Sequence, residues 1–83
     1  MYKVLVTGGS GLIGSNLIPY LVNCGYEVSN FDIKEPLDKS QNVFFNKVDI
    51  LDKSTLISKV LNFKPDYLIH LAAKADLNGK NLK

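Results

Sequence analysis

The segment that most constrains the fold of this chain is Thr7–Gly14, which reads TGGSGLIG. It follows a short apolar run, Tyr2–Val6, and leads directly into apolar residues at helical spacing. Read from Gly9 it fits G-x-G-x-x-G, and read from Gly8 it fits G-x-x-G-x-x-G. Glycines allow the backbone to approach a bound phosphate closely, and the start of a helix offers unpaired N–H groups. A glycine pattern alone is weak evidence, so its meaning depends on its flanks.

The flanks predict a strand, a glycine loop, a helix and a second strand in that order. Tyr2–Val6 is typical of a buried parallel strand, and Tyr26–Phe31 predicts another that ends at Asp32. Gly25 is a natural stop for the intervening helix, whose apolar positions are Leu12, Ile13, Leu17, Ile18, Leu21 and Val22. Asp32 lies about 20 residues beyond the glycines, where a dinucleotide-binding fingerprint places an acid for the ribose hydroxyls.

A phosphate-binding P-loop is the competing interpretation of the same glycines. Gly9 and Gly14 have the spacing of G-x-x-x-x-G-K-[ST], but Ser15 occupies the position of the required lysine. Nucleoside-triphosphate hydrolysis is therefore disfavoured.

The rest of the chain predicts two further strands and one further helix. Residues 33–42 are expected to form a loop with at most one irregular turn, residues 43–48 a third strand, and residues 66–73 a fourth strand and its turn. Between them we expect a helix capped by Asp52 or Ser54 and ended by Pro65, with an inner face of Leu56, Ile57, Val60 and Leu61. Residues 74–83 are expected to form a frayed tail beyond an ordered core of residues 1–73.

This order predicts an α/β fold of Rossmann type: a truncated parallel sheet in the order 3-2-1-4, with four strands and two main helices. Ligands of such sheets bind outside the carboxyl ends of the strands, where the strand order reverses. Residues 8–14, Asp32, Asp49 and residues 71–73 all fall on that edge. The open outer edge of the fourth strand is expected to permit self-association.

Composition excludes several classes of protein. The net charge is +2, from ten lysines against eight acidic residues, and no basic cluster indicates nucleic-acid binding. Cys24 is interpreted as a reduced, half-buried helix residue, and no metal-ligand cluster is apparent. Without a leader peptide or a membrane-length apolar stretch, we expect a cytoplasmic protein with no membrane partner.

These motifs resemble the extended short-chain dehydrogenase/reductase superfamily, in particular its NAD-dependent epimerase/dehydratase branch acting on nucleotide sugars. The resemblance runs from Tyr2 to about Ala75 and is carried by Thr7–Gly14, Asp32, Asp49-Ile50 and residues 70–73, His-Leu-Ala-Ala. It identifies the superfamily well and the substrate poorly. In this family a proline such as Pro19 within the first helix is tolerated, which predicts a kinked, unbroken helix.

The resemblance implies a role for each matching position. The cofactor-binding residues are Gly8, Gly9, Ser10, Gly11, Leu12, Ile13, Gly14, Asp32, Asp49, Ile50, Leu71, Ala72, Ala73 and Lys74. The amides of residues 10–13 would meet the pyrophosphate, Asp32 the adenosine ribose, and Asp49 with the Ile50 amide the adenine. Residues 71–73 would pass the centre of the dinucleotide, and Lys74 lies near the nicotinamide ribose. Asp32 would repel a 2′-phosphate, so NAD is favoured, although Lys34 keeps NADP as an alternative.

The catalytic residues of the family resembled have no counterpart in this sequence. Members use a Tyr-x-x-x-Lys pair and an upstream Ser or Thr beyond the fourth strand, and no tyrosine here has a lysine four residues later. His70 is interpreted as structural. We expect the N-terminal NAD-binding fragment of a nucleotide-sugar epimerase or dehydratase, with weak NAD binding, no turnover, and a sugar substrate only in a full-length form. The alternatives are a non-catalytic dinucleotide-binding module and a non-binding remnant.

Overall fold

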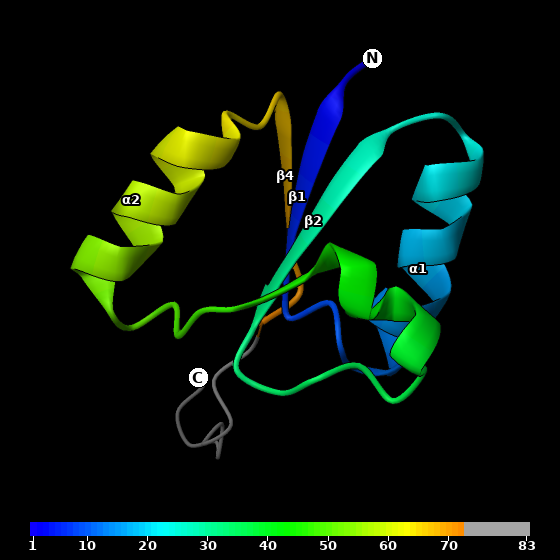
Figure 1. The fold of residues 1–83 in the computed structure, drawn as a ribbon, viewed down its shortest axis with the longest axis horizontal. Coiled ribbons are helices and arrows are strands. Elements are labelled where there is room, and N and C mark those ends of the chain that lie inside the picture. The colour runs from blue at the N-terminus through cyan, green and yellow to red at the C-terminus, as the bar shows by residue number, and fades with distance from the viewer. Residues whose placement is uncertain (73–83) are drawn as a thin grey trace, which may run out of the picture.

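The computed structural model describes residues 1–72 and forms three layers, with a parallel sheet between two helices (Figure 1). Helix α1 (Leu12–Asn23) covers one face of the sheet and α2 (Lys53–Phe63) covers the other. The strands are β1 (Lys3–Thr7), β2 (Glu27–Asp32), β3 (Phe45–Lys47) and β4 (Tyr67–His70). A 3-10 helix, η1 (Lys39–Phe44), lies beside α1.

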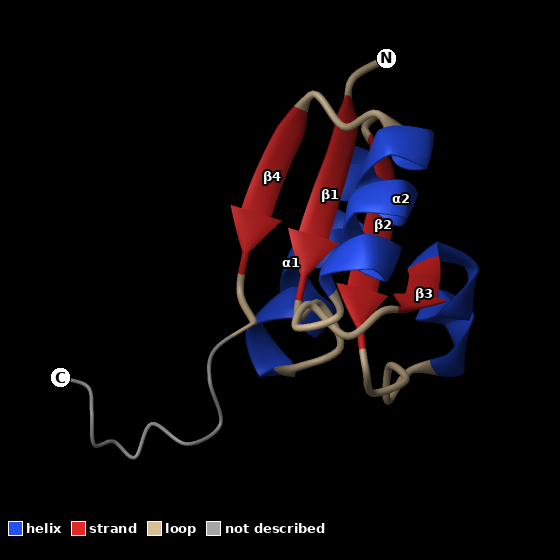
Figure 2. Cartoon of the chain, turned by 90° about the vertical axis from the view of Figure 1, so that its left-hand side faces the viewer, coloured by secondary structure: helices blue, strands red, loops and turns tan. Residues whose placement is uncertain are grey.

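The sheet has the order β3-β2-β1-β4 with every pairing parallel, which confirms the predicted order 3-2-1-4 (Figure 2). Val4 pairs with Val28 on one side and with Tyr67 on the other, so β1 is central. Within residues 1–72, the last strand β4 pairs with β1 and has no strand on its outer edge, and its Leu68 is 60% exposed. The reversal of strand order therefore lies between β1 and β4, where we predicted the binding edge.

The α1 face of the sheet holds the larger apolar cluster, made of Val4, Val6, Ile18, Leu21 and Val28. The helix continues through Pro19 from Leu12 to Asn23, so the proline does not break it. Gly25 has a φ of +94°, a left-handed conformation that glycine adopts without strain, and it ends the helix as predicted. Cys24 is exposed at the C-cap of α1, so the expectation of a half-buried cysteine is wrong.

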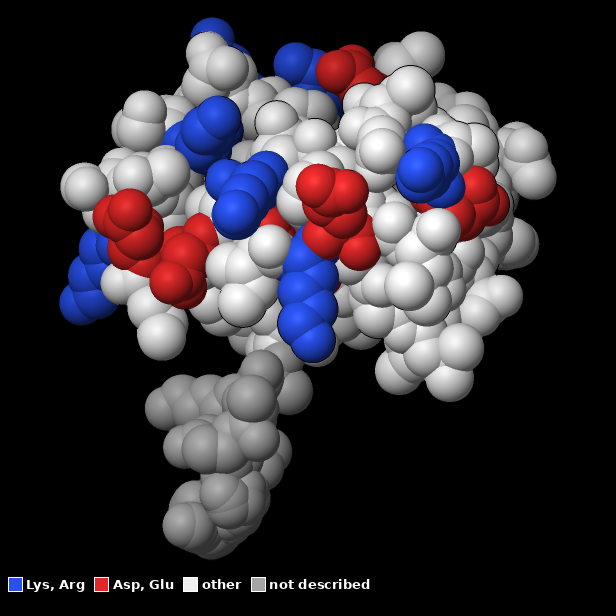
Figure 3. All heavy atoms as spheres, turned by 60° about the horizontal axis from the view of Figure 1, so that its bottom comes forward, with Lys and Arg blue, Asp and Glu red and all other residues white. Residues whose placement is uncertain are grey.

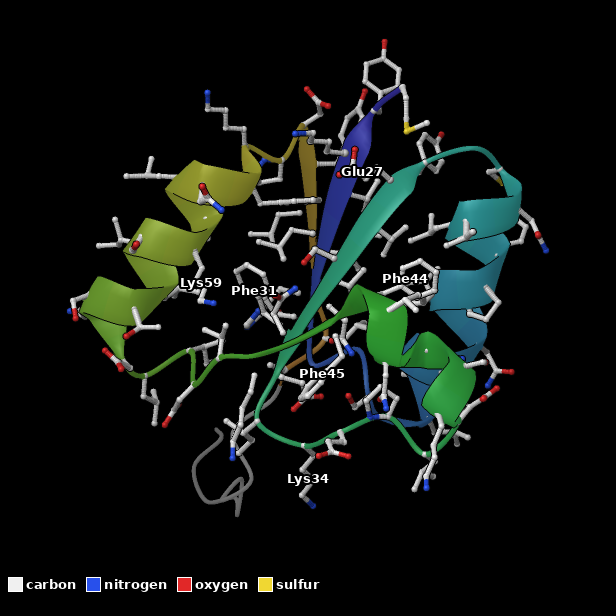
Figure 4. All side chains as sticks on the ribbon, viewed as in Figure 1. Glu27, Phe31, Lys34, Phe44, Phe45 and Lys59 are labelled. Atoms are coloured by element: carbon white, nitrogen blue, oxygen red, sulfur yellow. The ribbon has the colours of Figure 1, made fainter. Side chains whose placement is uncertain are left out.

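The α2 face holds a smaller cluster of Leu5, Phe31 and Val48, against which Leu56, Val60 and Phe63 pack. Figure 4 shows Phe31 directed from β2 toward α2. Ile57 and Leu61, which we assigned to the inner face of α2, are exposed. Phe63 takes their place, because the helix is rotated so that residues 56, 60 and 63 share the buried side.

The connection between β2 and β3 departs most from the sequence prediction. Val43 and Phe44, expected in the third strand, belong to η1, and β3 is confined to three residues. Asp38 caps η1 by accepting a hydrogen bond from the Ser40 amide, and Phe44 packs against the α1-side cluster. Because Phe44 is committed to that core, the strand can begin only after it.

Candidate functional site

One cleft of about 520 Å³ opens at the carboxyl ends of the strands. It lies where β1, β2 and β4 end, at the predicted point of strand reversal. Its walls come from the glycine loop, from the last residues of β2 and β4, and from the segments after β2, β3 and β4: Gly8, Ser10, Gly11, Phe31, Asp32, Ile33, Lys34, Val48, Asp49, Ile50, Leu51, His70, Leu71 and Ala72. The structure thus brings eight of the predicted site residues to one cavity.

The four glycines of the loop have different physical roles. Gly8 has a φ of +73°, and a Cβ there would lie 2.5 Å from the Ala72 amide nitrogen. A Cβ on Gly14 would lie 2.3 Å from the carbonyl oxygen of Gly9, and one on Gly9 would meet the Asn30 side chain. Among the atoms of residues 1–72, a Cβ on Gly11 would find only the Gly8 carbonyl oxygen within 4 Å, at 3.8 Å. Three glycines therefore permit close packing of the protein itself, while Gly11 leaves space beside the helix start.

Asn30 is a site residue that the sequence interpretation missed. Its side chain is fully buried on β2, where its Oδ1 accepts a hydrogen bond from the Gly9 amide at 2.8 Å. Its Nδ2 donates to the Ser10 hydroxyl at 3.1 Å. An uncharged amide in the buried part of a strand, between Ser29 and Phe31, was the available signal, because a buried polar side chain requires partners. Asn30 fixes the shape of the loop from the neighbouring strand.

Asp32 lies two residues further along β2 and contacts the same loop. Its Oδ2 accepts a hydrogen bond from the Ser10 amide at 3.0 Å, so this amide is committed to the protein. Its Oδ1 accepts from the amides of Ile33 at 2.7 Å and Lys34 at 3.2 Å. A carboxylate has about four acceptor positions, so these bonds orient it and leave capacity for a ligand hydroxyl.

The start of α1 forms the other polar part of the cleft. Gly11 is its N-cap and supplies no side-chain hydrogen bond to the first turn. The first amides of a helix have no carbonyl partner within it, and they carry the positive end of the helix dipole. Leu12 and Ile13 expose their side chains to solvent and do not line the cleft. Any contribution from these two residues to a ligand site must therefore come through their amides.

Asp49 and Ile50 line the cleft immediately after β3. One carboxylate oxygen of Asp49 accepts a hydrogen bond from the Leu51 amide at 2.9 Å, and its carbonyl accepts from the Asp52 amide. These bonds fold residues 49–52 into a tight turn before α2. Within residues 1–72, the second carboxylate oxygen of Asp49 accepts no hydrogen bond and is available for a ligand.

The end of β4 closes the cleft opposite Asp32. The Thr7 hydroxyl is hydrogen-bonded to Nδ1 of His70, and the Leu71 amide donates to the Thr7 carbonyl at 2.8 Å. The bond to Thr7 agrees with a structural role for His70, although the residue also lines the cleft. Ala72 lies against Gly8. Ala73 and Lys74, together with the expected tail, fall outside the described residues.

The charges around this end of the molecule are mixed. In Figure 3 lysines and carboxylates alternate over the face that includes the lower edge of Figure 1, without a patch of one sign. Within residues 1–72, no group of three His, Cys, Asp or Glu side chains is placed to hold a metal ion. Over the same residues, neither helix has the length and apolar character needed to cross a membrane.

The four-stranded parallel sheet and its glycine loop place this chain in the Rossmann-type class of α/β proteins. Residues 4–83 match the model of the NAD dependent epimerase/dehydratase family. The chain therefore belongs to that family, which confirms the resemblance seen in the sequence.

Individual relatives differ in their substrates. A probable dTDP-glucose 4,6-dehydratase of Sinorhizobium fredii is 38% identical over 85 residues, covering 92% of this chain and 24% of that protein. A 3-beta-hydroxysteroid dehydrogenase of Mycolicibacterium neoaurum is 37% identical over 78 residues, covering 93% of this chain and 21% of that protein.

Among solved structures, the UDP-glucose 4-epimerase of Thermus thermophilus in complex with NAD superposes with a TM-score of 0.76 at 36% identity. That similarity covers 88% of this chain and 24% of the epimerase. The chain spans about a quarter of the length of the relatives it matches.

Proposed function

We propose that this chain provides the NAD-binding part of a nucleotide-sugar epimerase or dehydratase. The observation that carries the proposal is the pairing of two features in one cleft. The uncapped first turn of α1 can receive a pyrophosphate, and the oriented carboxylate of Asp32 can receive ribose hydroxyls. Several relatives are epimerases or dehydratases of UDP- or dTDP-glucose, which supports the substrate class.

The residues present fit NAD. Gly11 leaves the backbone accessible at the helix start, and the cavity of about 520 Å³ extends past residues 71 and 72. Asp49 and Ile50 would meet the adenine, Asp32 the adenosine ribose, and the amides of residues 11–13 the pyrophosphate. The Ser10 amide is excluded from that set because Asp32 already engages it. Bound NAD would supply a hydride acceptor, and these residues would hold and orient it.

Asp32 supports NAD over NADP. A phosphate on the ribose 2′-oxygen would approach a carboxylate that is already fixed by three amides. Among residues 1–72, Lys34 is the one lysine lining the cleft, and its side chain extends away from the sheet in Figure 4. We propose that it does not neutralise a 2′-phosphate.

We further propose that these residues contribute cofactor binding and not the reacting groups. Tyr2, Tyr26 and Tyr67 lie at or just before the amino ends of β1, β2 and β4, opposite the cleft. The rings of Tyr2 and Tyr67 pack edge to face, with centroids 5.5 Å apart. We therefore expect no turnover of UDP-glucose or dTDP-glucose by the 83-residue chain. Product detected in a coupled assay of that chain would contradict this.

Calorimetric titration of the 83-residue chain with NAD and NADP tests cofactor binding. We expect weak, saturable binding of NAD and weaker binding of NADP. Asp32→Asn should weaken NAD binding about tenfold or more, since hydrogen bonds to a charged group are strong. It should also reduce the ratio of NAD affinity to NADP affinity, because the charge that repels a 2′-phosphate is removed.

Asp38→Asn is the matched control, because Asp38 lies in the same connection and does not line the cleft. Urea unfolding of each variant separates lost binding from lost folding. Equal NAD affinity of the Asp32→Asn variant and the unaltered chain would overturn the proposal, as would the absence of NAD binding to the folded chain.

A further inference from the structure

Gln41 makes a contact with α1 that the dinucleotide site does not explain. Its side chain is 6% exposed within η1, and its Nε2 donates a hydrogen bond to the carbonyl oxygen of Ser15 at 3.0 Å. The two residues are 26 positions apart in the chain. A buried long-range bond from a side-chain amide to a helix carbonyl is unusual, because such carbonyls normally have a partner within the helix.

The carbonyl of Ser15 lacks that partner because of Pro19. In an α-helix the carbonyl of residue 15 would accept from the amide of residue 19, and proline has no N–H. Pro19 therefore leaves the Ser15 carbonyl without its usual donor. The structure shows that Gln41 supplies the missing one.

The other polar atom of the Gln41 side chain, Oε1, shows that the hydrogen bond to Ser15 determines the orientation of the amide group. Its Oε1 is buried and has no hydrogen-bond partner among residues 1–72. Rotating the amide by half a turn would point that oxygen at the Ser15 carbonyl oxygen, so two acceptors would face each other. The side chain therefore keeps its Nε2 on Ser15 at the cost of an unpaired Oε1, which normally destabilises a fold.

The hydrogen bond between Gln41 and Ser15 attaches the connection between β2 and β3 to α1, and this connection also forms part of the cleft. This connection starts at Asp32, whose carboxylate holds the amides of Ile33 and Lys34, and it ends in η1. At the start of η1, hydrogen bonds from the Ser40 hydroxyl and amide hold the pKa of Asp38 below its ordinary value. At the end of η1, Phe44 points toward α1 in Figure 4. Gln41 lies between these two anchors.

We propose that Gln41 is a positioning residue: its side-chain amide replaces the backbone donor that Pro19 lacks, and thereby fastens residues 33–44 to α1. The bond links the helix whose first turn faces the pyrophosphate to the segment whose Ile33 and Lys34 line the ribose side. This second consequence rests on the proposed function, whereas the replacement of the donor does not.

A double-mutant cycle in urea unfolding of the 83-residue chain tests the replacement. Gln41→Met keeps the length of the side chain and removes the donor, and Pro19→Ala returns an N–H to the helix. With Pro19 in place, Gln41→Met should raise the unfolding equilibrium constant about fivefold or more, because Ser15 loses its donor. In the Pro19→Ala background the same change should alter it by less than about twofold, because the restored amide at position 19 now serves Ser15.

Asn42→Ala is the matched control, since Asn42 carries the neighbouring amide of η1 and is exposed. Its effect should be the same in both backgrounds. An equal effect of Gln41→Met in the two backgrounds would overturn the proposal. If Gln41→Met prevents folding, a folded Pro19→Ala/Gln41→Met chain still supports the proposal, and an unfolded one contradicts it.

NAD affinity distinguishes positioning from stability alone. In the double variant Ser15 is satisfied, but η1 has lost its bond to α1. We therefore expect NAD binding to stay weaker than in the unaltered chain even though stability is restored. If the NAD affinity of the double variant equals that of the unaltered chain once stability is restored, the positioning role of Gln41 is overturned. If the unaltered folded chain binds no NAD, the proposed function fails while the unfolding cycle still decides the role of Gln41.

Discussion

Helix α1 begins at Gly11, which gives its first turn no side-chain hydrogen bond, whereas α2 begins at Asp52, whose carboxylate accepts from the amide and hydroxyl of Thr55. Both helices start at the carboxyl edge of the sheet, and both present the positive end of a helix dipole there. The capping carboxylate occupies the first turn of α2 that an anion would otherwise use. A helix start is therefore available to a ligand only where the protein leaves its amides uncapped, as at Gly11.

The largest expected effect comes from Gly14→Ala, which tests how the open start of α1 is held. The added Cβ would lie 2.3 Å from the Gly9 carbonyl oxygen, within backbone that cannot move aside easily. We expect a loss of about 3 kcal/mol in the free energy of unfolding, at the upper end of typical overpacking costs. Urea denaturation measures it. Gly11→Ala is the control and should change stability little, because no atom lies within 3.4 Å of its Cβ position.

Gly11→Asp tests whether the start of α1 can be made to resemble that of α2. The new carboxylate can accept from the first-turn amides, so stability should be maintained or rise slightly. NAD binding should fall about tenfold or more, because the carboxylate occupies the same amides and repels the pyrophosphate. Gly11→Asn introduces a capping side chain without a negative charge. In calorimetric titration it should therefore weaken NAD binding less than Gly11→Asp does. Unchanged NAD affinity in the aspartate variant would contradict the assignment of the helix start.

The smallest effect is expected from Asp52→Asn, which weakens the cap of α2. The Thr55 hydroxyl, followed by the Thr55 amide, lowers the pKa of Asp52 below its ordinary 3.8. A lowered folded-state pKa contributes stability that is present above the unfolded value and is lost as pH falls through the folded value. The difference in stability from the unaltered chain should thus be visible at pH 7 and should shrink below about pH 4. NAD binding at pH 7 should be unchanged, since Asp52 lies outside the cleft.

Much of this architecture could be predicted because its signals are local. The apolar run before Gly8, the stop at Gly25 and the acid at Asp32 each define an element within a few residues, and the handedness of parallel crossovers then determines the strand order. That strand order alone places the loop residues, Asp32 and Asp49 together at one edge of the sheet. The cap of the second helix was predicted at Asp52 or Ser54 for the same reason, and the structure shows that it is Asp52.

The features that sequence reasoning missed depend on partners distant in the chain. Ile57 and Leu61 fit the apolar stripe as well as Val60, and only packing against Phe31 and Val48 selects the buried side. Phe44 has strand propensity but is held in η1 by the α1-side core. Asn30 and Gln41 are polar residues whose roles require knowing that Gly9 and Ser15 lie beside them. Single-residue propensity carries none of this information.

The central position of β1 has a consequence for how the chain folds. Val4, Leu5 and Val6 of β1 are almost completely buried in the final structure, but β1 gains its second neighbour only when β4 is made. The bond between Thr7 and His70 spans 63 positions, so sheet closure awaits nearly all of the described chain. Such non-local pairing slows folding. During synthesis β1 therefore waits longer than β2 for its second neighbour, and one of its edges stays unpaired until β4 is made.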